Sequence, residues 1–254
     1  KLVDEGYTVK ALKRPSTELS LLNDIKDKIQ WIDGDLVNVT ETENYLEGVH
    51  KVIHCAALVS YDQREEELIY QTNVEGTANL VNAALLQNVE LFVHLSSVAS
   101  IGKEKHVKVS TEETHWTEGE NVSTYARSKH QPELEVWRGW AEGLNTIIIN
   151  PSLVLGPGNW HKSSTQVFKY VYEERSFYTT GIVNYVDVRD VAEVTVRLMN
   201  SDLKGERFIL NSGNVSYKEL FDKIAAAMQK TPPGIRVGSN LIKAAIIFEK
   251  IRSK

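Results

Sequence analysis

Leu91-Phe92-Val93-His94-Leu95-Ser96-Ser97 is the stretch that decides the fold of this chain. Its first five residues form a short, mostly apolar run, which is typical of a parallel strand buried on both faces. Two hydroxyl side chains follow where that strand would end. Ligands of open α/β sheets bind outside the carboxyl ends of the strands, so we expect Ser97 to face a ligand-binding crevice.

Strand-like and helix-like segments alternate along the rest of the chain, which indicates an α/β fold. The expected strands are residues 7–12, 29–32, 51–55, 91–95 and 145–150. Residues 66–87 and 124–142 carry apolar side chains at three- and four-residue spacing, and both segments are long enough to form helices that cross a sheet. We expect a doubly wound parallel sheet of the Rossmann type.

Composition excludes several classes of function. The chain has 254 residues, 42% of them hydrophobic, and a net charge of −5, so it can form one domain or one domain with a small lobe. Because the basic residues form no long run, we expect no nucleic-acid partner. The longest apolar stretches, such as residues 241–248, are far shorter than the roughly 20 residues that span a bilayer, so we expect no membrane attachment.

Cysteine and histidine usage indicates a cytoplasmic protein without a metal centre. A single cysteine, Cys55, excludes an intramolecular disulfide and is typical of a reducing compartment. We expect Cys55 to be a small buried hydrophobic residue. None of the seven histidines stands in a metal-ligand spacing, so we expect no metal.

The pentapeptide Tyr125-Ala126-Arg127-Ser128-Lys129 lies at the start of the second expected helix. There Tyr125 and Lys129 stand at positions i and i+4 of one face, so a phenol and an ammonium reach the same small volume. A fixed ammonium stabilises the phenolate, which lets the phenol exchange protons near neutral pH. The motif alone is also compatible with a solvated helix face, and the preceding Ser97 favours an active site.

The chain resembles the extended short-chain dehydrogenase/reductase family, whose active site combines a serine, a tyrosine and a lysine in the order of Ser97, Tyr125 and Lys129. The resemblance covers essentially the whole chain. In that family the serine precedes a V/A-x-x-x-G run, which selects Ser97 over Ser96. The resemblance implies that Tyr125 protonates the substrate oxygen and that Ser97 orients the carbonyl. Lys129 would support the phenol and hold the nicotinamide ribose.

The resemblance also implies cofactor contacts along the strand ends. Lys13 and Arg14 follow the first expected strand, where an acidic residue would select NAD; positive charge there favours NADP, and a solvated basic turn is the alternative. Asp35 and Leu36 would lie beside the adenine, although Asp35 is equally typical of a turn. The remaining cofactor contacts implied are Cys55, Ala56, Ala57, Pro151, Ser152, Leu153 and Val154.

The beginning of the chain resembles the interior of a dinucleotide-binding fold. Residues 1–5, followed by Gly6, are typical of the last turn of a helix with a C′ glycine. In such a fold a strand and a G-x-x-G-x-x-G turn come first, and that strand lies between the strands expected at residues 7–12 and 51–55. We therefore expect those two strands not to pair, a further N-terminal segment in the full protein, and no cofactor binding by this chain alone.

Two departures concern the substrate. Nucleotide-sugar epimerases carry an arginine at the place of Val183, and they tend to carry R-x-x-N where this chain has Ile148-Ile149-Asn150-Pro151. Both features resemble the dihydroflavonol-4-reductase branch, which implies an NADP-dependent reductase of a small ketone or aldehyde. A nucleotide-sugar epimerase or dehydratase with NAD is the alternative. A non-catalytic NADP sensor is a third, against which the complete Ser-Tyr-Lys set argues.

The domain organisation and the assembly are also expectations. We expect a dinucleotide-binding core over residues 1–155 and a substrate lobe over residues 156–254, with residues 182–200 returning to the core. Trp137 and Trp140 form an apolar stripe on the helix that carries Tyr125. Core packing would explain this stripe. A homodimer is the alternative explanation, because relatives in the family pair these helices between subunits.

Overall fold

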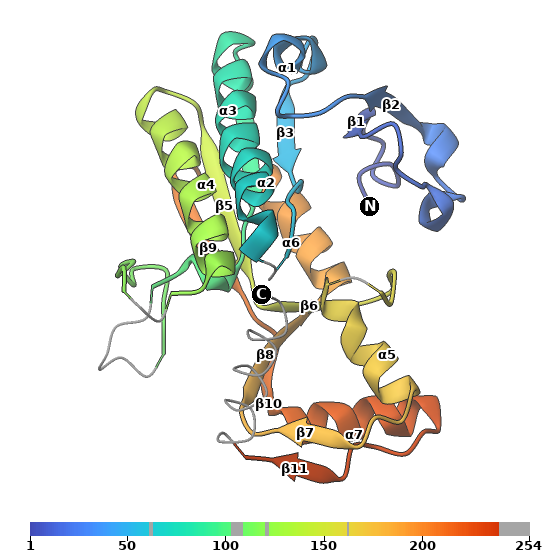
Figure 1. Ribbon diagram of the computed structural model, residues 1–254. Coiled ribbons are helices and arrows are strands. Elements are labelled where there is room, and N and C mark those ends of the chain that lie inside the picture. Colours follow the sequence, from blue (N-terminus) through green and yellow to red (C-terminus); the bar gives the residue numbers. More distant parts are fainter. Residues whose placement is uncertain (61–62, 103–108, 120–121, 162, 239–254) are drawn as a thin grey trace. The chain divides into compact units, whose positions relative to one another are not determined.

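The computed structural model describes residues 1–60, 63–102, 109–119, 122–161 and 163–238 (Figure 1). The chain divides into two compact units. Unit 1 comprises Lys1–Ser152 and Arg189–Leu210, and unit 2 comprises Leu153–Val188 and the residues from Asn211 onward. The expected α/β class is confirmed, since strands and helices alternate throughout unit 1.

The centre of unit 1 is a four-stranded parallel sheet in the order β3-β4-β5-β9. Its strands are β3 (Lys51–His54), β4 (Leu91–Leu95), β5 (Thr146–Pro151) and β9 (Glu206–Leu210). The strand at the centre of the prediction, residues 91–95, has the predicted bounds. Every residue of β5 is buried, as its apolar run requires.

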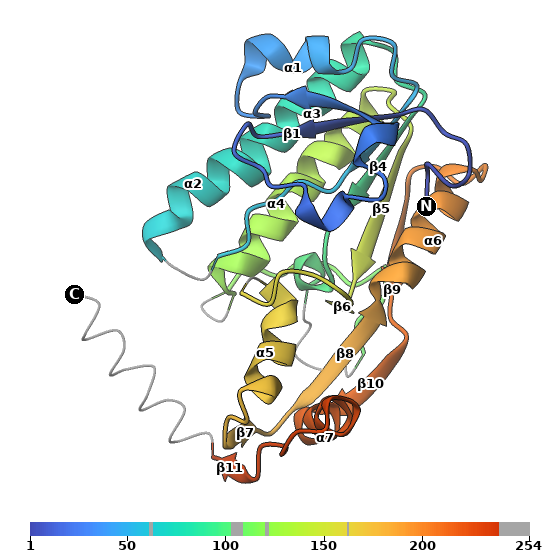
Figure 2. The ribbon, with the colours of Figure 1, turned by 90° about the vertical axis from the view of Figure 1, so that its right-hand side faces the viewer.

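Helices cover both faces of this sheet, which makes it doubly wound (Figure 2). On one face α3 (Gly76–Leu86) and α4 (Thr124–Ala141) pack Val81 and Val136 against Phe92 of β4. On the other face α6 (Val188–Met199) packs Val196 against the next residue of β4, Val93. Successive side chains of a strand point to opposite faces, so an uninterrupted apolar run supplies both cores.

A separate two-stranded parallel sheet joins β1 (Val9–Lys13) to β2 (Ile29–Asp33). Within the described residues β1 and β3 are not paired, as expected from the sequence. The turn before β1 has the expected helix-ending geometry: Tyr7 N–H donates to Leu2 O at 3.0 Å, Gly6 N–H donates to Val3 O at 3.1 Å, and Gly6 has a φ of +84°.

Shorter elements complete unit 1. They are the 3₁₀ turns η1 (Ser20–Leu22), η2 (Lys26–Lys28), η3 (Gln63–Glu65) and η5 (Val98–Ser100), the helices α1 (Val39–Tyr45) and α2 (Glu66–Tyr70), and the π turn η4 (Gln71–Glu75). The helix expected over residues 66–87 is therefore not one regular α-helix. The π turn η4 interrupts it between α2 and α3.

The described part of unit 2 contains two small sheets and two α-helices. Its elements are β6 (Leu153–Leu155), η6 (Ser163–Thr165), α5 (Gln166–Tyr172), β7 (Phe177–Thr179), β8 (Ile182–Asp187), β10 (Gly213–Ser216), α7 (Tyr217–Met228) and β11 (Ile235–Val237). β8 pairs with β10 and β6, while β7 pairs with β11. Ser216 caps α7, since its Oγ accepts from Glu219 N at 3.1 Å.

Candidate active site

Ser97 begins the turn that follows β4. It is the N-cap of η5, and its Oγ accepts a hydrogen bond from Ala99 N at 3.2 Å. The side chain is half-buried, whereas its neighbour Ser96 is buried and donates from Oγ to the carbonyl oxygen of Lys129 at 3.4 Å. The strand end thus lies against α4, and of the two serines Ser97 is the more exposed.

Tyr125 and Lys129 stand one turn apart at the start of α4. The helix begins at Thr124 because Ser123 caps it, its Oγ accepting from Ala126 N at 3.1 Å. Tyr125 is half-buried and Lys129 is buried. The structure therefore brings the expected serine, tyrosine and lysine to two packed elements of unit 1, η5 and α4.

The surroundings of Lys129 set its charge. Burial lowers the pKa of the Lys129 ammonium, and the Glu133 carboxylate one turn further along α4 opposes that shift. Two fully buried imidazoles also lie near this ammonium: burial and the Lys129 charge lower the pKa of His54 to about 4. Burial likewise holds the pKa of His94 well below its ordinary range. The Glu133 carboxylate therefore favours the charged form of Lys129.

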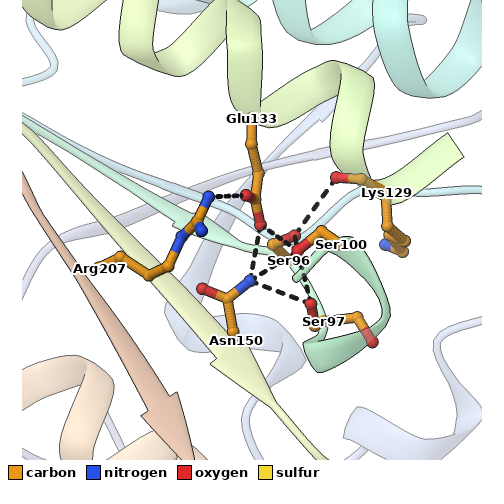
Figure 3. Close-up of polar contacts among 7 residues, drawn as sticks. All are labelled: Ser96, Ser97, Ser100, Lys129, Glu133, Asn150 and Arg207. Atoms are coloured by element: carbon orange, nitrogen blue, oxygen red, sulfur yellow. Dashed lines mark hydrogen bonds and ion pairs between the residues drawn. The ribbon is translucent and has the colours of Figure 1, made fainter. Parts of the chain in front are cut away.

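Glu133 is the centre of a buried polar network that the sequence analysis missed (Figure 3). It is 0% exposed. Its Oε1 accepts from Ser100 Oγ at 2.5 Å and from Asn150 Nδ2 at 2.6 Å, and its Oε2 pairs with the guanidinium of Arg207. A usable signal was present in the sequence, because Glu133 follows Lys129 by one helical turn on the same face.

The two basic residues expected at the cofactor ribose have different surroundings. Lys13 ends β1 and forms an ion pair with Asp33, which ends the neighbouring strand β2. Arg14 is exposed, and among the described residues no side chain forms a hydrogen bond or ion pair with its guanidinium. Of the two positive charges, only that of Arg14 is not already balanced by a bound carboxylate.

Asp35 and Leu36 occupy the turn after β2. Asp35 is exposed, and its Oδ1 accepts from Val37 N at 3.2 Å, which is the hydrogen bond of an Asx turn. Leu36 is buried in the core beneath α3, and its carbonyl accepts from Asn79 Nδ2 at 2.9 Å. Both residues lie after the carboxyl end of β2, and their expected place beside the adenine stays a prediction.

The segment after β3 is held by Asn73. Its side-chain amide bonds both backbone groups of Leu58, accepting from N at 2.7 Å and donating to O at 2.9 Å. Asn73 thereby fixes the backbone of the connection that follows β3. Asn73 lies in the π turn η4, and π turns recur at functional sites.

Cys55, Ala56 and Ala57 are the three residues that precede Leu58, and all of them are exposed. The expectation that Cys55 is buried was wrong, because β3 ends at His54 and the thiol lies in the connection beyond the sheet. Small side chains at the carboxyl end of a parallel strand allow a ligand to approach the backbone closely.

The last group of expected contacts is a run of four consecutive residues, two in each unit. Pro151 and Ser152 lie in unit 1, where both are buried, and Leu153 and Val154 lie in β6 of unit 2, where both are half-buried. The hydroxyl of Ser152 is buried and has no hydrogen-bond partner within the described residues. A buried, unpaired hydroxyl is costly, so this side chain suits a polar ligand atom.

Two further observations complete the description of the surroundings. Trp137 packs against the core between α4 and the sheet, which confirms core packing for that residue, and Trp140 is 41% exposed. In the described part of the chain, no cluster of three His, Cys, Asp or Glu side chains could hold a metal ion. None of the described helices has the length and apolar character needed to cross a bilayer.

Comparison with known sequences identifies a family and several relatives. The model of the NAD dependent epimerase/dehydratase family matches residues 1–211. A putative dihydroflavonol 4-reductase of Synechocystis sp. is 30% identical over 221 residues, which are 85% of this chain and 64% of that protein. Cinnamoyl-CoA reductase 1 of Petunia hybrida is 27% identical over 223 residues, which are 82% of this chain and 66% of that protein. The chain thus spans about two thirds of the length of these relatives.

A solved structure has the same fold. The crystal structure of gox2253 matches with a TM-score of 0.85 and 29% sequence identity, covering 98% of this chain and 76% of that chain. The doubly wound architecture of unit 1 is therefore that of an experimentally determined Rossmann-like protein.

Proposed function

The chain belongs to the NAD dependent epimerase/dehydratase family, and from that premise we propose that the full protein is an NADP-dependent reductase of a small ketone or aldehyde. The observation that carries the proposal is the arrangement of Ser97, Tyr125 and Lys129 on two packed elements beside the carboxyl end of β4. The names of two relatives, a dihydroflavonol 4-reductase and a cinnamoyl-CoA reductase, support a reductase.

The residues present fit a nicotinamide dinucleotide. The exposed backbone of Cys55, Ala56 and Ala57 offers close approach, and the buried hydroxyl of Ser152 offers an unused polar atom. Lys129 would hold the ribose hydroxyls. Asp35 and Leu36, at the end of β2, would hold the adenine, and Pro151, Leu153 and Val154 would line the nicotinamide. When bound, the nicotinamide supplies the hydride.

Each residue of the proposed site has one task. Ser97 donates a hydrogen bond to the substrate carbonyl and orients it. Tyr125 donates its phenolic proton to the carbonyl oxygen as that oxygen becomes an alcohol, and it takes the proton back in the reverse direction. Lys129 stabilises the phenolate that remains. The neutral imidazoles of His54 and His94 leave the Lys129 ammonium as the local positive charge.

Replacing Tyr125 tests this function. In the full-length protein, a panel of ketones and aldehydes is followed at the NADPH absorbance to find a substrate. Tyr125→Phe should then lower turnover by at least about a hundredfold, the scale of a lost general acid, with little change in NADPH affinity. Near-normal turnover of the variant would remove Tyr125 from the mechanism. A panel without any turnover, combined with intact NADPH binding, would favour a non-catalytic NADP sensor instead.

A nucleotide-sugar epimerase or dehydratase is the second candidate, because the family model that matches the chain includes such enzymes. It would use the same serine, tyrosine and lysine with tightly held NAD. Purified full-length protein that carries NAD, and whose melting temperature rises with UDP- or GDP-sugars, would establish this candidate over the reductase.

The organisation of the protein is also part of the proposal. Residues 1–155 would form the dinucleotide-binding core and residues 156–254 the substrate lobe, with residues 182–200 returning to the core. A homodimer would pair the α4 helices of two subunits, and the exposed part of Trp140 offers an apolar contact. Light scattering of the full-length protein measures that state directly.

A further inference from the structure

We propose that Glu133 is the positioning residue of this site: one buried carboxylate fixes both the turn that carries Ser97 and the helix that carries Lys129. This inference rests on the proposed function for its kinetic part and on geometry for the rest. Glu133 belongs to α4 and has no exposed surface. A carboxylate in such a place is retained only where hydrogen bonds and a counter-charge compensate its desolvation.

The carboxylate joins α4 to the turn after β4 and to the strands β5 and β9. Ser100 lies in the turn after β4, Asn150 lies near the end of β5, and Arg207 lies in β9. All three donate to Glu133, and all lie in unit 1 (Figure 3). One side chain therefore ties a helix to two neighbouring strands of the same parallel sheet and to the turn that follows a third.

The link from Glu133 to Ser97 runs through two residues that hold the Ser97 carbonyl. Asn150 Nδ2 lies 3.0 Å from Ser97 O, and Ser100 Oγ lies 2.7 Å from it. Ser100 has a single hydroxyl hydrogen, so it can donate either to Ser97 O or to Glu133 Oε1, while the two hydrogens of Asn150 Nδ2 can serve both acceptors. Without the carboxylate these donors lose their shared acceptor, and the two side chains that hold the Ser97 carbonyl are no longer fixed in position.

The link from Glu133 to Lys129 is electrostatic. The groups that face the Lys129 ammonium are Glu133 on its own helix, Cys55 and His54 from the β3 side, and His94 from β4. The two imidazoles are neutral because burial depresses the pKa of each, so Glu133 is the nearby anion that favours the charged form of Lys129. Removal of this carboxylate should lower the pKa of Lys129 further.

Two variants separate the effect of the Glu133 charge from the effect of the length of its side chain. Glu133→Gln keeps the length of the side chain and removes its charge, whereas Glu133→Asp keeps the charge and shortens the side chain by one methylene. The control is Glu135→Gln, which removes a carboxylate of the same helix that pairs with Arg138 at the surface. Trace labelling of Lys129 with acetic anhydride across pH, read by peptide mass spectrometry, needs no substrate because only the neutral amine reacts.

We expect Glu133→Gln to lower the labelling midpoint of Lys129 by about one pH unit, the scale of a lost opposite charge. Glu133→Asp should restore most of that midpoint, yet it should lose about tenfold to a hundredfold in kcat, because the shortened side chain no longer reaches Ser100 and Asn150 and Ser97 is no longer held in place. Glu135→Gln should match the wild type in both measurements. If Glu133→Gln does not fold, the double variant Glu133→Gln with Arg207→Gln, which leaves no unpaired buried charge, takes its place.

An unchanged Lys129 midpoint in folded Glu133→Gln would overturn the electrostatic link. A kcat of Glu133→Asp equal to that of the wild type would overturn the positioning of Ser97. A lowered midpoint in a protein that reduces no carbonyl would leave the link between Glu133 and Lys129 standing and would remove the reductase function alone.

Discussion

At the scale of single residues, the ion pair at the ends of β1 and β2 indicates that Lys13 and Arg14 would contribute unequally to the binding of a 2′-phosphate. Asp33 neutralises Lys13, so a 2′-phosphate bound there would depend chiefly on the Arg14 guanidinium. The sequence alone favours both residues equally, because it does not indicate that Asp33 lies beside Lys13 in the parallel register.

Arg14→Asp should therefore reverse the cofactor preference. A carboxylate repels the 2′-phosphate and accepts from ribose hydroxyls, so NADPH affinity should fall by about tenfold or more while NADH affinity rises. Quenching of NADPH and NADH fluorescence in the full-length protein measures both. Arg236→Asp, at an exposed arginine of unit 2, serves as the control for a general change of charge. Equal affinities of the wild type for the two cofactors would contradict the assignment.

Asp33→Asn should act in the opposite direction. It frees the Lys13 ammonium from its partner, so NADPH should bind more tightly in low salt, and the gain should shrink as salt screens the charge. Titrations at two salt concentrations check this. A loss of NADPH affinity would mean that Asp33 is needed to hold Lys13 in place.

At the scale of elements, α4 is the part of the molecule on which the site depends most. Its N-cap Ser123 lies two residues before Tyr125, and Gly139 lies against α3 so closely that an added Cβ would stand 2.7 Å from Val81. Its start and its packing therefore both fix where Tyr125, Lys129 and Glu133 lie.

Ser123→Ala should lower the free energy of unfolding by about 1 kcal/mol, the usual cost of a lost N-cap. Amide hydrogen exchange should become faster in the first turn of α4. The matched control is Ser216→Ala, which removes the equivalent cap of α7 at a similar cost, with faster exchange in α7 instead. Unchanged exchange around Tyr125 in Ser123→Ala would show that tertiary packing alone holds that turn.

The sequence predicted these elements well where periodicity was unbroken. The strand over residues 91–95 and the helix over residues 124–142 have bounds that agree with β4 and α4 to within a residue, because each is a continuous apolar or amphipathic run bounded by capping or turn residues. The π turn η4 was not predicted, since one extra residue in a long helix leaves the apolar spacing on either side intact.

The candidate site was less accessible to prediction. Ser97, Tyr125 and Lys129 stand out through residue type and order, but the partners of Glu133 come from one turn and two strands that are far apart in the chain. Periodicity gives the face of a helix on which Glu133 lies and does not give which strand ends meet it. Cys55 was misplaced for a related reason, because an apolar run does not fix the residue at which β3 ends.

At the scale of the whole molecule, the paired imidazoles of His54 and His94 couple stability to pH. Their ring centroids lie 5.1 Å apart between β3 and β4. His54 Nε2 lies 2.9 Å from Thr77 Oγ1, whose hydroxyl donates to Asn73 O, so His54 Nε2 carries the proton. Neither imidazole can be protonated in the folded state without placing a charge in the core.

The free energy of unfolding should therefore decrease as pH falls from about 6.5 to about 4. The folded pKa of His54, about 4, lies below the unfolded value near 6.5, so the unfolded state binds the proton first, and this one group accounts for about 3 kcal/mol across that range. Urea unfolding of the wild type and of His54→Gln at several pH values checks this. The variant should show a shallower dependence, and His161→Gln, at an exposed position of unit 2, should keep that of the wild type. Equal slopes in His54→Gln and the wild type would exclude this contribution.

The π turn Gln71–Glu75 contains one residue more than a regular α-helical turn, so the structure on either side of it depends on the exact number of residues in this helix. A regular α-helix turns by about 100° per residue, so losing one codon from this turn would rotate α2 about its axis relative to α3 and carry the Asn73 amide away from Leu58. Most single-nucleotide changes there would leave that geometry intact. Selection on this helix is therefore expected to act more strongly against insertions and deletions than against substitutions. In related sequences, the number of residues across this turn should vary less than the residue types.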